Sequence, residues 1–312
     1  MSEQKEIRAA YVDTLVELGA TNKNIVVLEA DLMSCTNTGA FKKAYPDRHI
    51  NCGVSEANMV GVAAGLSAAG KIPFAASFAC FSSRRVFDQF FLSANYAKLN
   101  VKLTGTDPGV TAAMNGGTHM PFEDLALMRV IPKLTIIEPS DYYACAAFVR
   151  QMAEEYGCHY LRFPRKPVPV IYNESETFKF GQAKVLKEGK DLCFVALGSL
   201  MVNQALSACE ELAKQGISAG VVDVLTLKPI DKSTILEQAC KVRAVISAEN
   251  AQMVGGLGSA VAEILAEEGY SGKFARIGIN EEFGEVGTQE YLVDRFGFDV
   301  ASFVKKAQTV LG

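Results

Sequence analysis

Glu56 is the carboxylate in this sequence whose setting most suggests chemistry. It opens a predicted helix over residues 55–69 whose next eight residues, 57–64, are all uncharged. Ser55 could cap this helix, and Glu56 could simply complement the helix dipole. Spacing alone favours that structural interpretation. The alternative is a carboxyl group that works in a partly dry cleft.

Aromatic residues and a histidine form a second candidate set. Phe78 and Phe81 flank a small-residue stretch directly after an apolar segment. Two aromatics at this spacing usually pack in a core, but they could also hold a flat heteroaromatic ring. His119, in GGTHMPFED, is either a structural hydrogen-bonding residue or a catalyst. The glycines at 116 and 117 allow the backbone there to approach a ligand closely.

Two further segments are weaker candidates. Arg84 and Arg85 are interpreted as solvated or capping residues. The glycines of MVGGLGSAVAEIL, residues 253–265, could suggest a phosphate-binding loop. Their spacing fits neither the dinucleotide fingerprint nor the P-loop, so we interpret them as easing a helix against its neighbour.

The elements that must position these residues alternate regularly along the chain. Apolar, β-branched runs such as NIVVLEAD, NVKLTGT and LTIIEPS are separated by segments with helical periodicity. This alternation predicts an α/β fold with parallel sheets covered on both faces. Residues 166–182, rich in proline and polar residues, are predicted to link two three-layer α/β/α domains at 1–165 and 183–312. Ligands of such sheets gather at the carboxyl ends of the strands, where the candidate loops lie.

Composition excludes several classes of function. The net charge of −4 and pI of about 5.6 give no basic footprint for nucleic acid or a membrane surface. No apolar run reaches the ~20 residues of a membrane span, and the N-terminus does not resemble a signal peptide, so we predict a cytoplasmic protein. The eight cysteines include no CxxC pair and are predicted to be reduced and mostly buried. Three histidines without a Cys/His cluster predict no metal site built by this chain.

Taken together, these segments resemble the transketolase family, most closely its two-subunit members. The segment GVSEANMVGVAAGLSAAGKIPFAASFACFSSRRVFDQ, followed by GGTHMPFEDLALMRVIPKLTIIEPSD, is similar to the pyrimidine-binding domain. VALGSLMVNQALSACEELAKQGI, AENAQMVGGLGSAVAE and GINEEFGEVGTQEYLVDRFG are similar to the transketolase C-terminal domain. The resemblance covers nearly the whole chain. It implies a transferase of carbohydrate metabolism that moves a two-carbon ketol unit from a ketose to an aldose.

The resemblance also implies residue roles around thiamine diphosphate. Glu56 matches the glutamate that hydrogen-bonds the aminopyrimidine ring and promotes its imino form, the base that deprotonates the thiazolium carbon. This role now outweighs the helix-cap interpretation. Phe78 and Phe81 match the aromatic wall around the pyrimidine, and Asp31 and Leu32 match positions that contact the cofactor.

Substrate positions carry both matches and departures. His119 matches a histidine that contacts sugar hydroxyls, and Arg8 and Arg165 match arginines that hold the sugar phosphate. The departures are Asn115 in place of an acidic residue, Asp107 in place of a histidine that contacts phosphate, Cys35 in place of a serine, and Arg84 in place of an aromatic residue or glycine. Because Asp107 would repel a phosphate dianion, we expect a branched sugar phosphate or a sulfonated sugar rather than an ordinary pentose or hexose phosphate.

One expected motif is missing from the 312 residues. Full-length family members bind magnesium and the diphosphate through a GDG motif, and none occurs here. The resemblance therefore implies an N-terminal partner subunit that carries this motif, in a heterotetramer with two copies of each chain. Three alternatives stay open: the beta subunit of a 2-oxo-acid dehydrogenase, a fragment of a deoxyxylulose-phosphate synthase, and a non-catalytic assembly partner.

Overall fold

A seven-stranded sheet organises the first lobe of the molecule. The computed structural model describes residues 3–312. The strand order is β12-β6-β7-β5-β4-β2-β3, and every strand is parallel to its neighbours except β12. The strands are β2 (Ile25–Glu29), β3 (His49–Asn51), β4 (Ile72–Phe78), β5 (Lys102–Thr106), β6 (Thr135–Ile137), β7 (His159–Phe163) and β12 (Thr226–Lys228).

Helices cover both faces of this sheet, and its central strands are therefore buried along their whole length. One face packs against α1 (Ile7–Thr21), α3 (Gly39–Ala44) and α7 (Tyr142–Glu154). The other packs against α4 (Glu56–Ala68), the π-helical turn η2 (Phe90–Tyr96) and α6 (Asp124–Arg129). Shorter pieces are α2 (Met33–Thr36), η1 (Pro46–Arg48), α5 (Phe87–Gln89), η3 (Gly109–Asn115) and η4 (Gly117–His119). The predicted helix over 55–69 is confirmed as α4.

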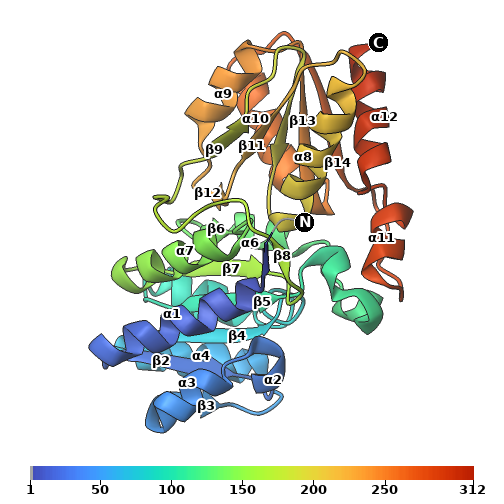
Figure 1. Cartoon of the computed structure of the whole chain (residues 1–312). Helices are drawn as coiled ribbons and strands as arrows, with labels where there is room; N and C mark the ends of the chain where they lie inside the picture. Colours follow the sequence, from blue (N-terminus) through green and yellow to red (C-terminus); the bar gives the residue numbers. More distant parts are fainter. Residues whose placement is uncertain (1–2) are drawn as a thin grey trace.

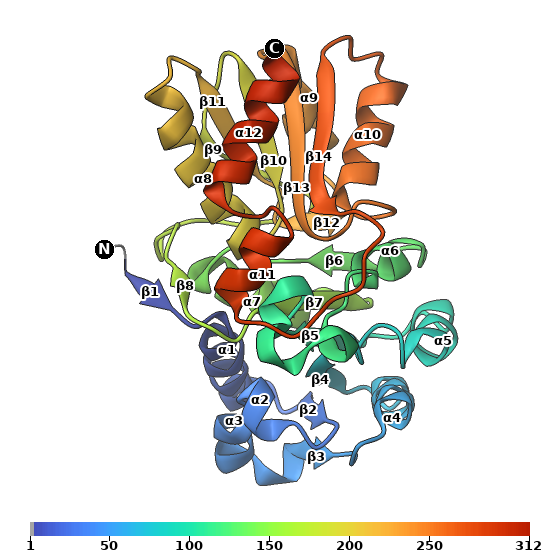
Figure 2. The same ribbon diagram turned by 90° about the vertical axis from the view of Figure 1, so that its right-hand side faces the viewer.

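The second lobe lies above the first and contains a five-stranded sheet (Figure 1). Its order is β14-β13-β10-β11-β9, with only β9 antiparallel. The strands are β9 (Lys184–Lys187), β10 (Leu192–Ala196), β11 (Ala219–Asp223), β13 (Ala244–Gln252) and β14 (Lys273–Ile279). One face packs on α8 (Ser199–Ala213), α11 (Gln289–Arg295) and α12 (Val300–Leu311). Figure 2 shows α12 in front of the strands and α11 below them. The other carries α9 (Lys232–Cys240) and α10 (Leu257–Glu267). The predicted α/β fold with two layered, mainly parallel sheets is confirmed.

A segment of the second lobe adds an edge strand to the sheet of the first lobe, which the hydrophobic pattern did not reveal. AGVVDVLTL looks like one strand, but the backbone turns at Leu225, which has a positive φ of 59°. The residues before it form β11 in the second sheet, and those after it form β12 at the edge of the first sheet. Both pieces are buried and apolar, so periodicity cannot distinguish one strand from two.

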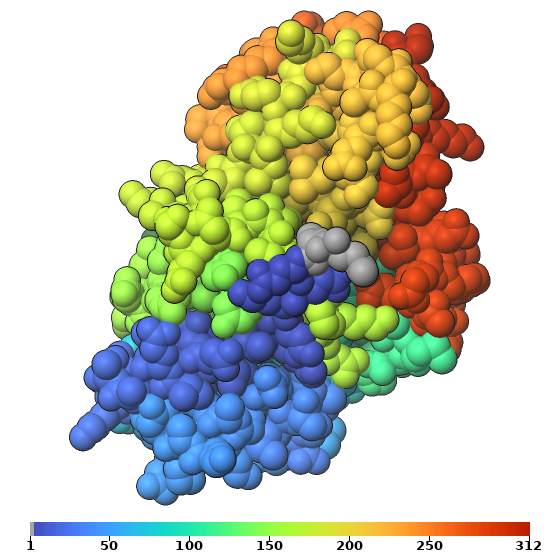
Figure 3. Space-filling view, viewed as in Figure 1, coloured from blue at the N-terminus to red at the C-terminus, as the bar shows by residue number. Residues whose placement is uncertain are grey.

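Two other segments differ from their predicted form. Residues 83–97, whose apolar spacing predicts one continuous helix, instead form turns, the short α5 and the π-helical turn η2. The predicted linker at 166–182 contains β8 (Val168–Pro169), which pairs antiparallel with β1 (Gln4–Lys5). In the space-filling view the blue N-terminal segment lies between the two lobes (Figure 3). The two ends of the first lobe are thereby joined to each other.

A buried ion cluster at the base of the second lobe joins the two sheets. Arg162, at 0% exposure, donates from Nε to Glu138 (2.8 Å) and from Nη1 to Asp124 (2.7 Å). Its Nη2 also donates to the backbone carbonyl of Asn250, at 3.3 Å, in the second lobe. Burial raises the pKa of Glu138 to about 7, against the lowering effect of Arg162. The guanidinium thus compensates two carboxylates and holds a backbone carbonyl across the lobe boundary.

Two further observations concern membrane-spanning helices and the cysteines. Within residues 3–312, no helix combines the length and apolar character needed to cross a bilayer. All eight cysteines are free thiols, and five of them are buried.

Replacing Arg162 by methionine should destabilise the protein by about 3–5 kcal/mol, because it leaves Asp124 and Glu138 buried without a compensating charge. Chemical denaturation of the purified chain measures this loss. Arg150→Ala is the matched control, since it breaks an exposed ion pair with Glu17 and should cost less than about 1 kcal/mol. Adding Asp124→Asn and Glu138→Gln to Arg162→Met should recover part of the stability; no recovery would contradict the charge-compensation argument.

Asp223 should make stability depend on pH. Burial raises the pKa of this carboxyl from 3.8 to about 7, although the hydrogen bond that Tyr172 donates to it opposes the rise. A group whose folded pKa is raised binds a proton on folding. Its stabilising contribution is therefore full below pH 3.8 and is lost as the pH rises to about 7.

Asp223→Asn should flatten the fall of the unfolding free energy over this range by up to about 1.4 kcal/mol per pH unit. Thermal or urea unfolding at several pH values measures the slope, and Glu17→Gln serves as a surface control. An unchanged slope in Asp223→Asn would show that Asp223 does not take up the proton.

Candidate functional site

Glu56 lies in a buried position and is bound by an arginine. It is 2% exposed at the start of α4, and Ser55, at the N-cap, makes no side-chain capping bond. Nη1 of Arg85 donates to both carboxylate oxygens, at 3.0 and 2.9 Å. The same guanidinium lies over the ring of Phe81, 3.9 Å from its centroid. Arg85 is therefore not simply solvated, as its sequence context suggested, but joins the carboxylate to the aromatic wall.

Phe78, Phe81 and His119 form one aromatic cluster beside this pair. The two phenylalanine rings meet edge to face at 6.1 Å, and the imidazole lies 5.1 Å from Phe81 and 5.7 Å from Phe78. Phe78 ends β4, and His119 comes from η4, so the sheet edge and a loop meet here. Phe81 and His119 line a cavity of about 350 Å³, together with Cys80, Arg84, Arg85 and Thr118. A flat apolar ring thus faces an accessible space, and Arg85 links that ring to the buried Glu56 carboxylate.

Charged residues line a second cavity of about 530 Å³. Arg8 pairs with Glu6 at 2.8 Å, and Arg165 pairs with Asp107. Asp107 is 2% exposed; burial raises the pKa of its carboxyl, while Arg165 opposes the rise. The Arg165 guanidinium also lies 5.2 Å from the centroid of the Phe78 ring. Phe78 therefore lies between Arg165, which lines the charged cavity, and the rings of Phe81 and His119, which line the first cavity.

The second lobe shapes the loop that separates these cavities. Residues Asp107 to His119 turn through η3 and η4, and Figure 2 shows α11 beside this segment. Asn250 donates to the Pro108 carbonyl (2.9 Å) and accepts from the Val110 amide (2.9 Å). Gly109 has a φ of +54°, and a Cβ there would lie 2.1 Å from the Asn250 side chain. Only glycine fits between the loop and the second lobe at this point.

The other predicted residues lie along the same edge of the first sheet. Asp31 and Leu32 follow β2, whose neighbour β4 ends at Phe78. Asp31 has a φ of 59° and accepts a hydrogen bond from Asn51 at 3.0 Å. Cys35 is partly buried in α2. Asn115 is exposed and lines the charged cavity.

The glycine-rich segment at 255–258 binds an anion of the protein itself. The backbone amides of Leu257 and Gly258, at the start of α10, each donate to the Glu249 carboxylate at 2.7 Å. A Cβ on Gly256 would lie 1.9 Å from that carboxylate. The glycines therefore accommodate a buried internal carboxylate, consistent with a packing role.

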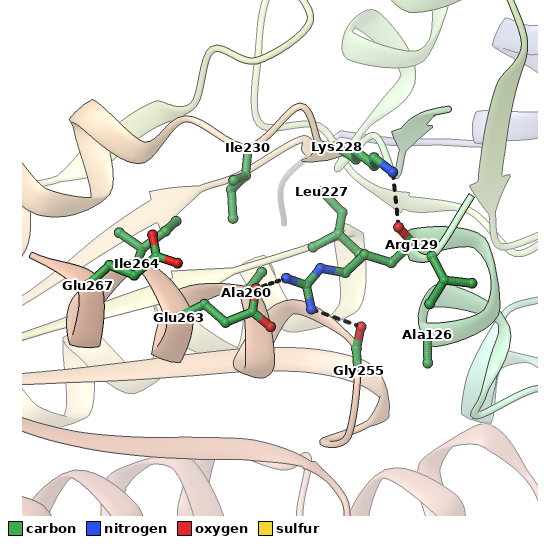
Figure 4. A pocket seen from close by; sticks show the side chains of 11 residues that line it. Ala126, Arg129, Leu227, Lys228, Ile230, Gly255, Ala260, Glu263, Ile264 and Glu267 are labelled. Atoms are coloured by element: carbon green, nitrogen blue, oxygen red, sulfur yellow. Dashed lines mark hydrogen bonds and ion pairs between the residues drawn. The ribbon is translucent and has the colours of Figure 1, made fainter. Parts of the chain in front are cut away.

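A further cavity of about 390 Å³ lies at the boundary between the lobes (Figure 4). Arg129 pairs there with Glu263 and donates to the Gly255 carbonyl, and Lys228 donates to the Arg129 carbonyl at 3.0 Å. None of the predicted site residues lines it. Its charged groups bind one another across the boundary, so we assign it to lobe packing.

Comparisons with known proteins agree with this geometry. The family model "Transketolase, pyrimidine binding domain" matches residues 3–170, and the family model "Transketolase, C-terminal domain" matches residues 181–302. This chain belongs to the transketolase family. The two domain matches, together with the relatives that are named transketolases, confirm the transketolase-type activity expected from the resemblance.

Several relatives are themselves parts of divided enzymes. The chain is 47% identical over 308 residues to the 6-deoxy-6-sulfo-D-fructose transketolase subunit SqwH of Clostridium sp. (strain MSTE9), covering 99% of this chain and 95% of that protein. It is 43% identical over 304 residues to a putative transketolase C-terminal section of Methanocaldococcus jannaschii, covering 97% and 95%. A solved split-gene transketolase, described as an inactive beta4 tetramer, is 44% identical, with a TM-score of 0.91 over 98% of each chain.

The transketolase family implies thiamine diphosphate and a divalent metal ion. The buried Glu56 carboxylate and the Phe78–Phe81 wall fit the pyrimidine part of this cofactor, which needs a hydrogen-bond partner and a flat apolar surface. Within residues 3–312, no group of three or more His, Cys, Asp or Glu side chains is arranged to hold a metal ion.

Sequence reasoning missed several residues of these cavities. Arg85 binds Glu56, and Arg84 pairs with Glu123 at 3.0 Å, although both arginines looked like surface residues. The charged cavity is also lined by Lys166 and by Thr288, Gln289 and Glu290 from the second lobe. The only sequence signal for Thr288, Gln289 and Glu290 was that they lie in GINEEFGEVGTQEYLVDRFG, a segment similar to the family. That similarity does not say which of its residues face the first lobe.

Proposed function

We propose that this chain supplies the pyrimidine side of a composite active site in a two-chain, thiamine-diphosphate-dependent transketolase. The observation that carries the proposal is the buried Glu56 carboxylate beside an accessible aromatic wall. An N-terminal subunit with a GDG motif would supply the diphosphate and magnesium site, in a cytoplasmic heterotetramer of two copies of each chain. The names of the relatives, as a subunit, a C-terminal section and a split-gene product, support a partner.

The cofactor, when bound, supplies the carbanion chemistry of ketol transfer. In this proposal Glu56 shares a proton with a pyrimidine nitrogen, and Phe78 and Phe81 hold the ring. Asp31 and Leu32 contact the cofactor from the end of β2. His119 hydrogen-bonds the sugar hydroxyls, because its ring borders the aromatic cluster at the mouth of the cavity.

We further propose that the charged cavity binds the anionic end of the sugar. Arg8, Arg165 and Lys166 are its cations, and each faces a carboxylate: Glu6, Asp107 and Glu290, the last at 3.9 Å. Asn115 and Cys35 stand nearby in place of residues that the family uses to contact sugar hydroxyls and phosphate. Three positive and three negative groups leave the cavity close to electrically neutral.

A nearly neutral cavity discriminates between one and two negative charges. A sulfonate carries a single charge, whereas a phosphate monoester carries about −1.5 to −2 at neutral pH. An extra negative charge at ~6 Å from Asp107 meets roughly 3 kcal/mol of repulsion from that carboxylate at an effective dielectric constant of ~20, and the paired Arg165 offsets only part of it. A ketose with a terminal sulfonate is therefore the favoured donor. The name of the Clostridium relative, which includes a sulfofructose, supports this choice.

The composite-site proposal predicts that cofactor binds only when both chains are present. Calorimetric titration with thiamine diphosphate and magnesium should show binding to the complex purified with the adjacently encoded subunit, and none to this chain alone. Glu56→Gln should lower kcat of the complex about 10²–10⁴-fold, because the proton-sharing carboxyl is lost. Tight binding by this chain alone, or full activity of Glu56→Gln, would contradict the proposal.

Substrate discrimination should depend on Asp107. In the complex, Asp107→Asn should raise kcat/KM for a 6-phosphorylated ketose about 10–100-fold relative to its 6-sulfonated analogue, because one repulsive charge is removed. The remote Glu17→Gln substitution removes a surface carboxylate and should leave the ratio unchanged. A wild-type complex with full activity on xylulose 5-phosphate and ribose 5-phosphate would overturn the sulfonate assignment.

A further inference from the structure

Arg85 lies on both of the surfaces that the proposed pyrimidine site requires. Its Nη1 is within 3.0 Å of both Glu56 oxygens, and its guanidinium carbon is 3.9 Å from the centroid of Phe81. We infer that Arg85 is an internal, displaceable substitute for the pyrimidine ring and that it sets the affinity for the cofactor. This inference rests on the proposed function of the Glu56 site.

The chemistry of a guanidinium group matches that of an aminopyrimidine in two respects. Both are flat and delocalised, so both stack on an aromatic face. Both present N–H groups in their own plane, so both can hydrogen-bond a carboxylate at the edge of the stack. Glu56 and Phe81 can satisfy one such group at a time, and a ring bound to them must displace Arg85.

Burial explains why the chain needs such a substitute. Glu56 is 2% exposed, and an ionised carboxylate at this depth without a partner would be costly. The Arg85 side chain is 48% exposed, so it can reach the carboxylate from the surface and return to solvent without disturbing the core. Within residues 3–312, its side-chain hydrogen bonds run to Glu56 alone. Arg85 therefore stabilises Glu56 from a position that it can leave.

The neighbouring arginine shows the contrast. Arg84 has a similar exposure, 44%, but its guanidinium pairs with Glu123 at 3.0 Å and donates to the Thr118 carbonyl at 3.0 Å. It borders the same cavity without covering Glu56. Removing Arg84 changes the charge at the cavity mouth by the same amount and leaves the Glu56 pair in place. It is the matched control for Arg85.

Displacement of Arg85 has a measurable effect on affinity. When only a fraction of the molecules is competent to bind, the apparent dissociation constant rises by the inverse of that fraction. If Arg85 covers Glu56 about nine-tenths of the time, Arg85→Ala should bind thiamine diphosphate about tenfold more tightly than the wild type. Arg85→Lys keeps the charge but loses the flat stack, and should fall between them.

The test is calorimetric titration of the reconstituted two-chain complex with thiamine diphosphate at fixed magnesium, for the wild type, Arg85→Ala, Arg85→Lys and Arg84→Ala. Tighter binding in Arg85→Ala than in Arg84→Ala supports the inference, because both variants remove one positive charge beside the same cavity and only Arg85→Ala uncovers Glu56. Unchanged or weaker binding in Arg85→Ala overturns it, because Arg85 would then be neutral or would help to hold the bound cofactor. If the wild-type complex and all the variants fail to bind cofactor, the proposed function fails as well.

Thermal unfolding of the chain alone gives a second readout that needs no cofactor. Arg85→Ala should lower the unfolding midpoint more in the wild-type background than in Glu56→Gln, because the neutral amide does not need the arginine. Equal effects in the two backgrounds would show that the pair is not energetically coupled and would overturn the inference. This result is independent of the partner subunit, so it separates a failure of the inference from a failure of the composite-site proposal.

Discussion

The three-way contact of Arg162 is the constraint on which the rest of the molecule depends. The unexposed Arg162 guanidinium projects from β7. It compensates Asp124 and Glu138 and donates to the Asn250 carbonyl in the other lobe. Buried charges tolerate little displacement, because each lost hydrogen bond leaves an uncompensated group in a medium of low polarity. Asn250 in turn holds the loop that begins at Pro108, so the register between the lobes is transmitted directly to the loop that separates the two cavities.

Arginine–carboxylate pairs also occur in the candidate site, but there they lie closer to the protein surface than the Arg162 cluster. Arg85 covers Glu56, and Arg165 covers Asp107, yet both arginines remain partly accessible. The buried partner in each pair is the carboxylate, and the more exposed partner is the cation. A ligand can therefore exchange with the cation without unfolding the core. The deep cluster at Arg162 gives rigidity, whereas the shallow pairs give sites that a ligand can enter.

Much of the fold could be predicted from the sequence because its signals are local. Alternating apolar and amphipathic segments identified the α/β class, and the uncharged run after Glu56 located α4. The turn at Leu225 could not be predicted, since both halves of AGVVDVLTL are equally apolar and only the tertiary structure assigns them to different sheets. In the site, residue types and the family resemblance indicated Glu56, Phe78, Phe81 and His119, which the structure brings together. Arg85 and Glu290 were missed because a charged side chain in a polar segment carries no periodic signal, and only its distance from a distant partner reveals its part.

The contact between Gly109 and Asn250 has a consequence for how such enzymes diversify. The loop that borders the charged cavity takes its shape from a neighbour about 140 positions away in the chain, with no room for a methyl group between them. A change of substrate preference by loop substitution alone is therefore restricted to side chains that leave this seam intact. Grafting the loop onto another family member would transfer its sequence but not its conformation, unless the contacting residues of the second lobe were grafted as well. Substrate specificity therefore depends jointly on the loop around Gly109 and on the second-lobe surface around Asn250.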